Sequence, residues 1–251
     1  MSITQKEVRK SSRRLTLSLP FDAKLSIKIR PIIICREIEH SDFAQSIFER
    51  IKVKMISSIY NRRSTRKFID KPISQKDIID IIQSGIKAPS SKNRQPWKFV
   101  VIQGNAKENM INVFRLGIGR EENDSALLPQ SRQHIASAKY TIDIMAEAPT
   151  IVFVVNSLGK SIMEELTTEE RVYEICNIQT ISAAIQNVLL AATEKGIGSL
   201  WICDIYFAYP ELCKWLNSDG QLIAAIAFGY PNEFPKERPR KKIDDVVEWR
   251  K

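Results

Sequence analysis

The feature that most constrains the fold is an uninterrupted apolar run, Thr150 to Val155, followed by a long helical pattern from about Val172 to Lys195. A short run rich in Val, Ile and Phe is typical of a buried strand. The helical pattern contains alanines that permit close packing, and Gly196, a common residue just beyond a helix C-terminus, follows it. The two segments predict a sheet packed against long helices.

Other periodic segments extend this pattern along the chain. We expect helices over residues 41–59, 74–86, 106–148 and 209–216, the third broken near 117–119 and 123–124. Strands are expected over residues 99–102, 200–203 and 222–228. No segment repeats, and no G-x-G-x-x-G motif follows a first strand, so a Rossmann dinucleotide-binding unit is not indicated.

Composition excludes several classes of protein. Hydrophobic residues make up 43% of the 251 residues, and no apolar run approaches the roughly 18 residues of a membrane span. The four cysteines lack C-x-x-C spacing and there are only two histidines, so no metal site is expected. Free thiols suit a reducing compartment, and the start of the chain has no hydrophobic signal-peptide core, so we expect a cytoplasmic protein.

A dense basic run, Arg62-Arg63-Ser64-Thr65-Arg66, follows the first expected helix. Guanidiniums this close repel one another, and they are held together most readily around an anion. Arginine binds phosphate oxygens two at a time, and a serine hydroxyl can donate to the same group. The alternative is a solvated basic turn.

A second polar segment, residues 88–99, lies between a helix and a strand about twenty residues further on. Two prolines stiffen it, and its serines, amides and Trp97 suit contact with a polar heteroaromatic ring. The two segments together indicate a ligand that carries both a phosphate and such a ring.

The chain resembles the flavin-dependent nitroreductase family in two motifs that occur in the family's order. They are Arg62-Arg63-Ser64-x-Arg66 and Pro89-Ser90-Ser91-x-Asn93-x-Gln95-Pro96-Trp97. Two later pieces agree with the resemblance. Gly196-Ile197-Gly198-Ser199-Leu200-Trp201 resembles the family's strand beside the isoalloxazine ring. Gly229-Tyr230-Pro231, followed by Arg238-Pro239-Arg240, resembles its C-terminal phosphate clamp. The resemblance spans about residues 50 to 251.

The resemblance implies a role for each matching residue. The family's contacts with the FMN phosphate and the polar edge of the ring fall on Arg62, Ser64, Arg66 and Arg240. Arg63 would contribute mainly its backbone, and Arg238 would either assist or be a solvated surface arginine. The contacts from the other subunit fall on Pro89, Ser90, Ser91 and Asn93. The backbone groups that line the ring near N5 fall on Trp201, Ile202 and Cys203.

The resemblance also implies an α+β fold, with a central mixed or antiparallel sheet flanked by helices, in an intertwined homodimer. The reaction would be ping-pong: NADH or NADPH reduces the FMN and leaves, and a nitroaromatic, a quinone or an activated alkene then takes the hydride. No catalytic side chain stands out, and Cys203 is expected to be an inert thiol. A segment near 114–140 would cover the flavin and select the acceptor, which remains open, as does the choice between NADH and NADPH.

The start of the chain lies outside the resemblance. Residues 1–36 hold nine Lys or Arg against Glu7 and Asp22, and so carry +7 of the net charge of +9. We therefore expect a basic extension over residues 1–40, a domain over 41–251, and neither nucleic-acid nor membrane partners for that domain. Alternating leucines and isoleucines over 15–29 predict a hairpin or two extended arms that pack on the domain or across the dimer.

Two alternative hypotheses remain, one for the extension and one for the function of the whole protein. Its Ser- and Arg-rich composition also resembles an organelle transit peptide, which the strand pattern fits poorly. A non-catalytic protein that recruits an acidic partner through the basic extension is the rival to the enzyme.

Overall fold

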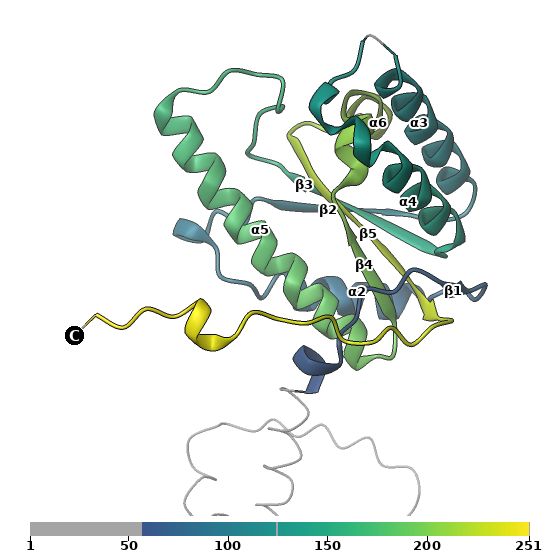
Figure 1. Cartoon of the computed structure of the whole chain (residues 1–251), viewed down its shortest axis with the longest axis vertical. Coiled ribbons are helices and arrows are strands. Elements are labelled where there is room, and N and C mark those ends of the chain that lie inside the picture. Colours follow the sequence, from purple (N-terminus) through teal and green to yellow (C-terminus); the bar gives the residue numbers. More distant parts are fainter. Residues whose placement is uncertain (1–56, 124, 251) are drawn as a thin grey trace, which may run out of the picture. The chain divides into compact units, whose positions relative to one another are not determined.

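The computed structural model describes residues 57–123 and 125–250 (Figure 1). The chain divides into two units, residues 1–50 and 51–251, and the described residues belong to the second. The predicted basic extension, its hairpin, the domain boundary after residue 40 and most of the helix expected over 41–59 lie outside the described residues. Of that helix, residues 57–61 are described and are helical.

The described part is built on a five-stranded sheet whose ladders are all antiparallel (Figure 1). Its strands are β1 (Phe68–Ile69), β2 (Trp97–Ile102), β3 (Thr150–Asn156), β4 (Gly198–Ile202) and β5 (Gln221–Pro231). The order is β1-β5-β3-β2, with β4 also paired to β5. The predicted α+β class with a central sheet is confirmed.

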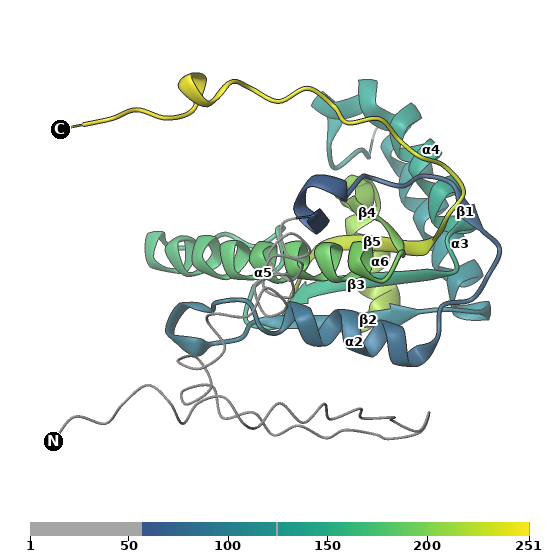
Figure 2. The ribbon, with the colours of Figure 1, turned by 90° about the horizontal axis from the view of Figure 1, so that it is seen from below.

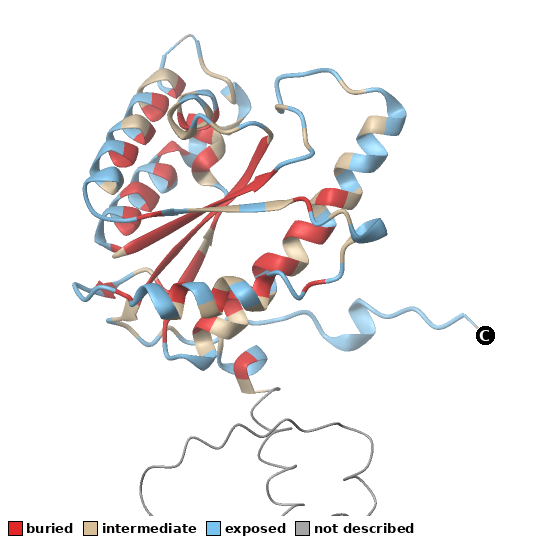
Figure 3. Cartoon of the chain, turned by 180° about the vertical axis from the view of Figure 1, so that it is seen from behind, coloured by how far each residue is buried: buried red, intermediate tan, exposed pale blue. Residues whose placement is uncertain are grey.

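Helices cover both faces of this sheet. One face carries α2 (Gln75–Gly85) and α5 (Thr168–Glu194), and the other carries α3 (Asn105–Glu121), α4 (Ile135–Glu147) and α6 (Tyr209–Leu216). Side chains alternate along β3: Val152 and Val154 pack toward α5, whereas Ile151 and Phe153 pack toward α3 and α4. Every residue of β3 is buried, as the apolar run predicted (Figure 3).

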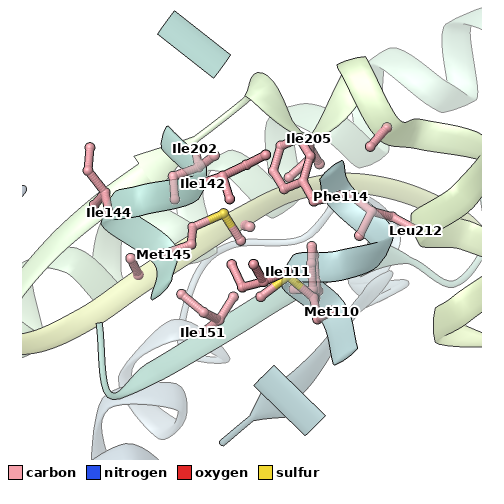
Figure 4. Close-up of a cluster of buried hydrophobic side chains, with 14 of the residues drawn as sticks. Met110, Ile111, Phe114, Ile142, Ile144, Met145, Ile151, Ile202, Ile205 and Leu212 are labelled. Carbon is pink, nitrogen blue, oxygen red and sulfur yellow. The ribbon is translucent and has the colours of Figure 1, made fainter. Parts of the chain in front are cut away.

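The core on the α3 and α4 side is built from methionine, isoleucine and phenylalanine side chains (Figure 4). Met110, Phe114 and Met145 have no exposed surface. On the opposite face, Ile181 and Ile185 of α5 are equally inaccessible (Figure 2 shows α5 running along the sheet). The strands therefore lie between two apolar helix layers.

Local capping explains where the two helices of the α2–α5 layer begin. The Ser74 hydroxyl accepts a hydrogen bond from the Asp77 N–H at 3.0 Å, which confirms the predicted start of α2. Helix α5 starts at Thr168, earlier than predicted, because Thr167 and Glu170 form a reciprocal capping box. It ends at Glu194, and Gly196 follows with φ +69°, in the left-handed conformation expected after a helix.

The predicted break at residues 117–119 is wrong, because α3 continues through both glycines to Glu121. Gly117 lies against the loop before α6, where an added Cβ would come within 2.2 Å of the Ala208 Cβ. That glycine allows two elements to approach closely and does not end the helix. The second predicted break, near residue 123, is confirmed, and a 3-10 segment, η3 (Pro129–His134), precedes α4.

A buried carboxylate holds the connection between α3 and α4. Glu121 has no exposed surface and accepts hydrogen bonds from the backbone N–H groups of Leu127 and Leu128 at 2.8 and 2.9 Å. Arg120 donates to Glu121 and, at 2.7 Å, to Glu211 of α6. Burial of Glu121 is tolerable because its charge is paired and its oxygens accept several donors.

Candidate functional site

The arginine-rich segment lies beside strand β4. Ser64 forms a parallel bridge with Ser199, and the Thr65 N–H donates to the Ser199 carbonyl oxygen at 3.0 Å. Gly198 makes the approach possible, because an added Cβ would lie 2.7 Å from the Thr65 Oγ1. Just beyond this segment, Phe68 pairs with Pro231 of β5. Two ends of the domain that are distant in sequence therefore meet at this segment.

Alternation along the segment separates its side chains into two sets. In extended backbone, residues two apart lie on the same side, so Arg62, Ser64 and Arg66 share one side. Thr65 is buried, and together with Arg63 it lines a cavity of about 310 Å³ between this segment, β4 and residues 231–235. None of Arg62, Ser64 and Arg66 lines that cavity, so the three predicted phosphate ligands face elsewhere.

The charges on the first side converge without a counter-charge. Partial burial lowers the pKa of Arg62, and the nearby charges of Arg240 and Arg63 lower it further. Within the described residues, Arg62, Arg66 and Arg240 form no ion pair, whereas the Arg63 guanidinium lies 3.5 Å from Glu237. Arg62 and Arg240 are thus near one another and neither forms an ion pair with a carboxylate of the described residues, an arrangement that favours an anion between them.

Arg63 is the arginine of this segment whose guanidinium has a carboxylate partner among the described residues. Its guanidinium donates to the backbone carbonyls of Tyr60 and, at 2.9 Å, of Arg62. These bonds and the pair with Glu237 engage its donors within the chain. This placement supports the view that Arg63 contributes mainly backbone to a ligand.

Glu233 is a residue of this region that sequence reasoning missed. Its carboxylate accepts a hydrogen bond from the Arg66 backbone N–H at 2.5 Å, and so ties residues after β5 to the arginine segment. No motif marks this glutamate. The period-two spacing of Arg62, Ser64 and Arg66, by contrast, was a readable signal of an extended segment.

The end of β4 provides backbone groups near the arginines. Strand β4 pairs with β5 on one edge, and among the described residues the other edge meets only the arginine segment at Ser199. From Trp201 to Cys203 that edge therefore has no strand partner in the described part of the chain. Trp201 is half-buried, Ile202 is buried, and Cys203 is exposed.

Titratable side chains near this edge are not activated as nucleophiles. Although Cys203 is exposed as a residue, the groups around its thiol partly desolvate it and raise its pKa, and the neighbouring Asp204 charge raises it further. Burial raises the pKa of Tyr206 to about 12, and its hydroxyl donates to the Ile223 carbonyl oxygen at 2.9 Å. Both groups stay protonated near neutral pH, so the arrangement supports binding and not covalent catalysis by the thiol.

The second predicted segment contacts a different element. Within the described residues, no hydrogen bond or ion pair joins the Pro89–Asn93 loop to the arginine segment; instead the Ser91 N–H donates to the Thr180 hydroxyl of α5 at 3.4 Å. Pro89, Ser91 and Asn93 are exposed and Ser90 is half-buried. The predicted site residues of one chain therefore fall into two separate groups, which we call candidate half-sites. The first group comprises the arginine segment, β4 and Arg240, and the second is this loop.

Two arginines of the segment near 114–140, which is expected to select the acceptor, are engaged within the chain. Arg120 donates to Glu121, Glu211 and the Phe207 carbonyl, and Arg132 donates to the Asn123 carbonyl at 2.9 Å. Both therefore stabilise the connection between α3 and α4.

Comparison with known proteins agrees with the predicted family and fold. The model of the Nitroreductase family matches residues 59–230. An Archaeoglobus fulgidus protein, provisionally named NADH dehydrogenase/NAD(P)H nitroreductase, is 31% identical over 71% of this chain and 86% of its own length. A Haemophilus influenzae protein, provisionally named NAD(P)H nitroreductase, is 27% identical over 78% of this chain and 96% of its own.

Solved structures give the same picture. One is the crystal structure of a provisionally named nitroreductase from Desulfovibrio desulfuricans in complex with FMN, which is 25% identical in sequence and has a TM-score of 0.58. The match covers 78% of this chain and 96% of the Desulfovibrio chain. A BluB-like flavoprotein from Clostridium difficile 630 shares the fold, with a TM-score of 0.65 and 24% sequence identity. The match covers 78% of this chain and 99% of the flavoprotein chain.

Proposed function

The chain belongs to the nitroreductase family, and from this premise we propose that it is an FMN-dependent oxidoreductase that uses NADH or NADPH to reduce an electron-poor small molecule. The observation that carries the proposal is the convergence of Arg62 and Arg240, which lack carboxylate partners within the described residues. Two guanidiniums and the Ser64 hydroxyl fit a terminal phosphate dianion such as that of FMN.

The residues of this chain bind and orient the cofactor. Arg62, Ser64 and Arg240 bind the phosphate, and Arg66, two residues further along the same side, reaches the polar edge of the ring. The free edge of β4 at Trp201–Cys203 faces the ring with backbone groups. FMN, when bound, supplies hydride transfer from the nicotinamide and then to the acceptor, so the chain needs no nucleophile of its own.

The functional unit is a homodimer. Apolar side chains lie exposed on the N-terminal half of α5 and the loop before it: Leu158, Ile162, Met163, Val172, Tyr173 and Ile175. Helix α5 is long and apolar enough to cross a membrane, yet its Ile181 and Ile185 have no exposed surface. Figure 3 shows buried residues where α5 lies over the sheet. A second copy that covers the exposed half also brings the partner subunit's loop 89–93 to the arginine half-site.

The substrate class follows from the cofactor. A reduced flavin transfers hydride to nitroaromatics, quinones and activated alkenes, and the family resemblance assigns the choice among them to the segment near 114–140. The arginine half-site has a full set of phosphate ligands, which argues against a vestigial site in a protein that only recruits partners. The proposed location is the cytoplasm.

The decisive experiment is the identification of the cofactor in purified protein. The protein should be yellow and should release FMN, and not FAD, on denaturation, because the arginines converge on a terminal phosphate. NADH or NADPH should bleach it anaerobically, and an added quinone or nitroaromatic should restore the colour. Colourless protein that fails to take up added FMN would sink the proposal.

A further inference from the structure

The loop at residues 90–95 adopts an uncommon backbone conformation. Lys92, Asn93 and Gln95 have φ values of 51°, 52° and 49°, in the left-handed region that residues other than glycine seldom occupy. Asparagine tolerates this region better than lysine and glutamine do. Such a loop persists only when its surroundings determine its shape, and backbone of this kind clusters at ligand-binding sites.

Hydrogen bonds within the loop account for part of this shape. The Gln95 N–H donates to the Ser90 hydroxyl at 2.7 Å, and the Gln95 side-chain amide donates to the Asn93 Oδ1 at 3.0 Å. The Asn93 N–H donates to the Ser90 carbonyl at 2.9 Å. These bonds close the loop on itself but do not attach it to the domain.

Arg94 provides an attachment to α5. Its guanidinium carbon lies 4.2 Å from the centre of the Tyr173 ring, a cation–π distance, and no carboxylate pairs with it within the described residues. Tyr173 and Thr180 are seven residues apart and lie on one face of α5, so this face holds the loop at both Arg94 and Ser91. Lys92, Asn93 and Gln95 are exposed, whereas Arg94 is half-buried.

We propose that Arg94 is a positioning residue, whose stack on Tyr173 holds loop 90–95 in the conformation described above and so presents Ser90, Ser91 and Asn93 to the cofactor. The proposal rests on the proposed function for the identity of the cofactor. Because Tyr173 also belongs to the exposed apolar half of α5, formation of the dimer desolvates the stack and strengthens it.

The test compares Arg94→Met and Tyr173→Leu with two reference variants. Tyr173→Phe keeps the ring and loses only the hydroxyl, which donates to Glu169 at 3.1 Å. Arg115→Met removes an exposed guanidinium on α3, far from this loop in the chain. Amide hydrogen exchange is measured on the FMN-free protein, FMN affinity by quenching of flavin fluorescence, and dimerisation by light scattering.

Arg94→Met and Tyr173→Leu should each accelerate exchange at the Asn93 and Gln95 amides and weaken FMN binding by about two- to thirtyfold. The double variant should be no worse than either single one, because both remove the same contact. Tyr173→Phe and Arg115→Met should behave as wild type. Wild-type exchange and affinity in Tyr173→Leu, or additive losses in the double variant, would overturn the proposal.

Two further outcomes separate this proposal from its premise. A weaker FMN affinity in Arg94→Met with unchanged loop exchange would show that Arg94 contacts the cofactor directly, and would also overturn the positioning role. A wild-type protein that binds no FMN would refute the proposed function. Amide exchange in the FMN-free variants would then still show whether the stack of Arg94 on Tyr173 holds the loop.

Discussion

At the scale of single residues, charge repulsion governs the candidate site. Arg62 feels the charges of both Arg240 and Arg63, and within the described residues only Arg63 has an acidic partner. Loss of one guanidinium relieves repulsion in the free protein but removes a contact from the complex. Such variants should therefore fold normally and bind the cofactor poorly.

We expect Arg66→Ala and Arg240→Ala each to remove a charge-assisted contact of about 1.5–3 kcal/mol. FMN affinity should fall by roughly ten- to a hundredfold in titrations that follow flavin fluorescence. Arg115→Ala, a change of the same charge on the surface of α3, should leave the affinity unchanged. Wild-type affinity in both Arg66→Ala and Arg240→Ala would show that these arginines do not hold the cofactor.

At the scale of elements, caps and close contacts decide where helices begin and how they pack. The two glycines of α3, Gly117 and Gly119, illustrate the effect of close contacts on packing. They lie two residues apart in one helix and have different surroundings. An added Cβ at Gly117 would collide with Ala208, whereas nothing lies within 4 Å of the same position at Gly119.

Gly117→Ala should destabilise the protein by about 1–3 kcal/mol, because the backbone around Ala208 must move to accommodate a methyl group. Gly119→Ala should instead be neutral or stabilise by up to about 1 kcal/mol, because alanine is the better helix former. Urea unfolding of the two variants measures the difference. Equal stabilities would mean that α3 and the start of α6 do not pack as described.

The start of α5 should depend on pH through Glu170. A hydrogen bond from Lys160, followed by bonds from the Thr167 backbone and hydroxyl, lowers the pKa of this carboxyl from 4.5 to about 2. Because the folded-state pKa is depressed, its stabilising contribution is full above about 4.5 and is lost as the pH falls toward 2. Lys160→Met should raise the Glu170 pKa more than Thr167→Ala does, in an NMR titration of the carboxyl carbon. The reverse order would contradict the assignment of Lys160 as the main cause.

At the scale of the whole molecule, the exposed apolar half of α5 requires a cover. Val172 is 53% exposed and Ile175 is 48% exposed, on the helix that carries the contacts of the second half-site. The proposed dimer through this surface would account both for the exposure and for the separation of the two candidate half-sites within one chain.

Ile175→Glu should place a charge in the subunit contact and convert the dimer to monomer, as measured by light scattering. FMN affinity should fall with it, because each flavin needs the partner's loop. Leu116→Glu, at an apolar side chain of α3 that is 69% exposed, should leave the protein dimeric. A monomeric wild-type protein that still holds FMN would rule out the shared site.

The sequence by itself determined the features that depend on neighbouring residues. The apolar run of β3, the Ser74 cap of α2 and the helix Tyr209–Leu216 were all predicted at or near their observed bounds. The family was readable for the same reason, since the motifs with Arg62–Arg66 and Pro89–Trp97 are contiguous. Local propensity and motif spacing depend on residues that are close together in the chain, so both can be recognised in the sequence alone.

Only the tertiary structure decided which distant residues meet. It placed Arg240 near Arg62, put Glu233 against the Arg66 backbone, kept α3 continuous through Gly117, and stacked Arg94 on Tyr173. Each contact joins segments that pair through the sheet or pack through a helix face. Such long-range contacts cannot be predicted from spacing along the chain, because they depend on how β1, β4 and α5 pack together.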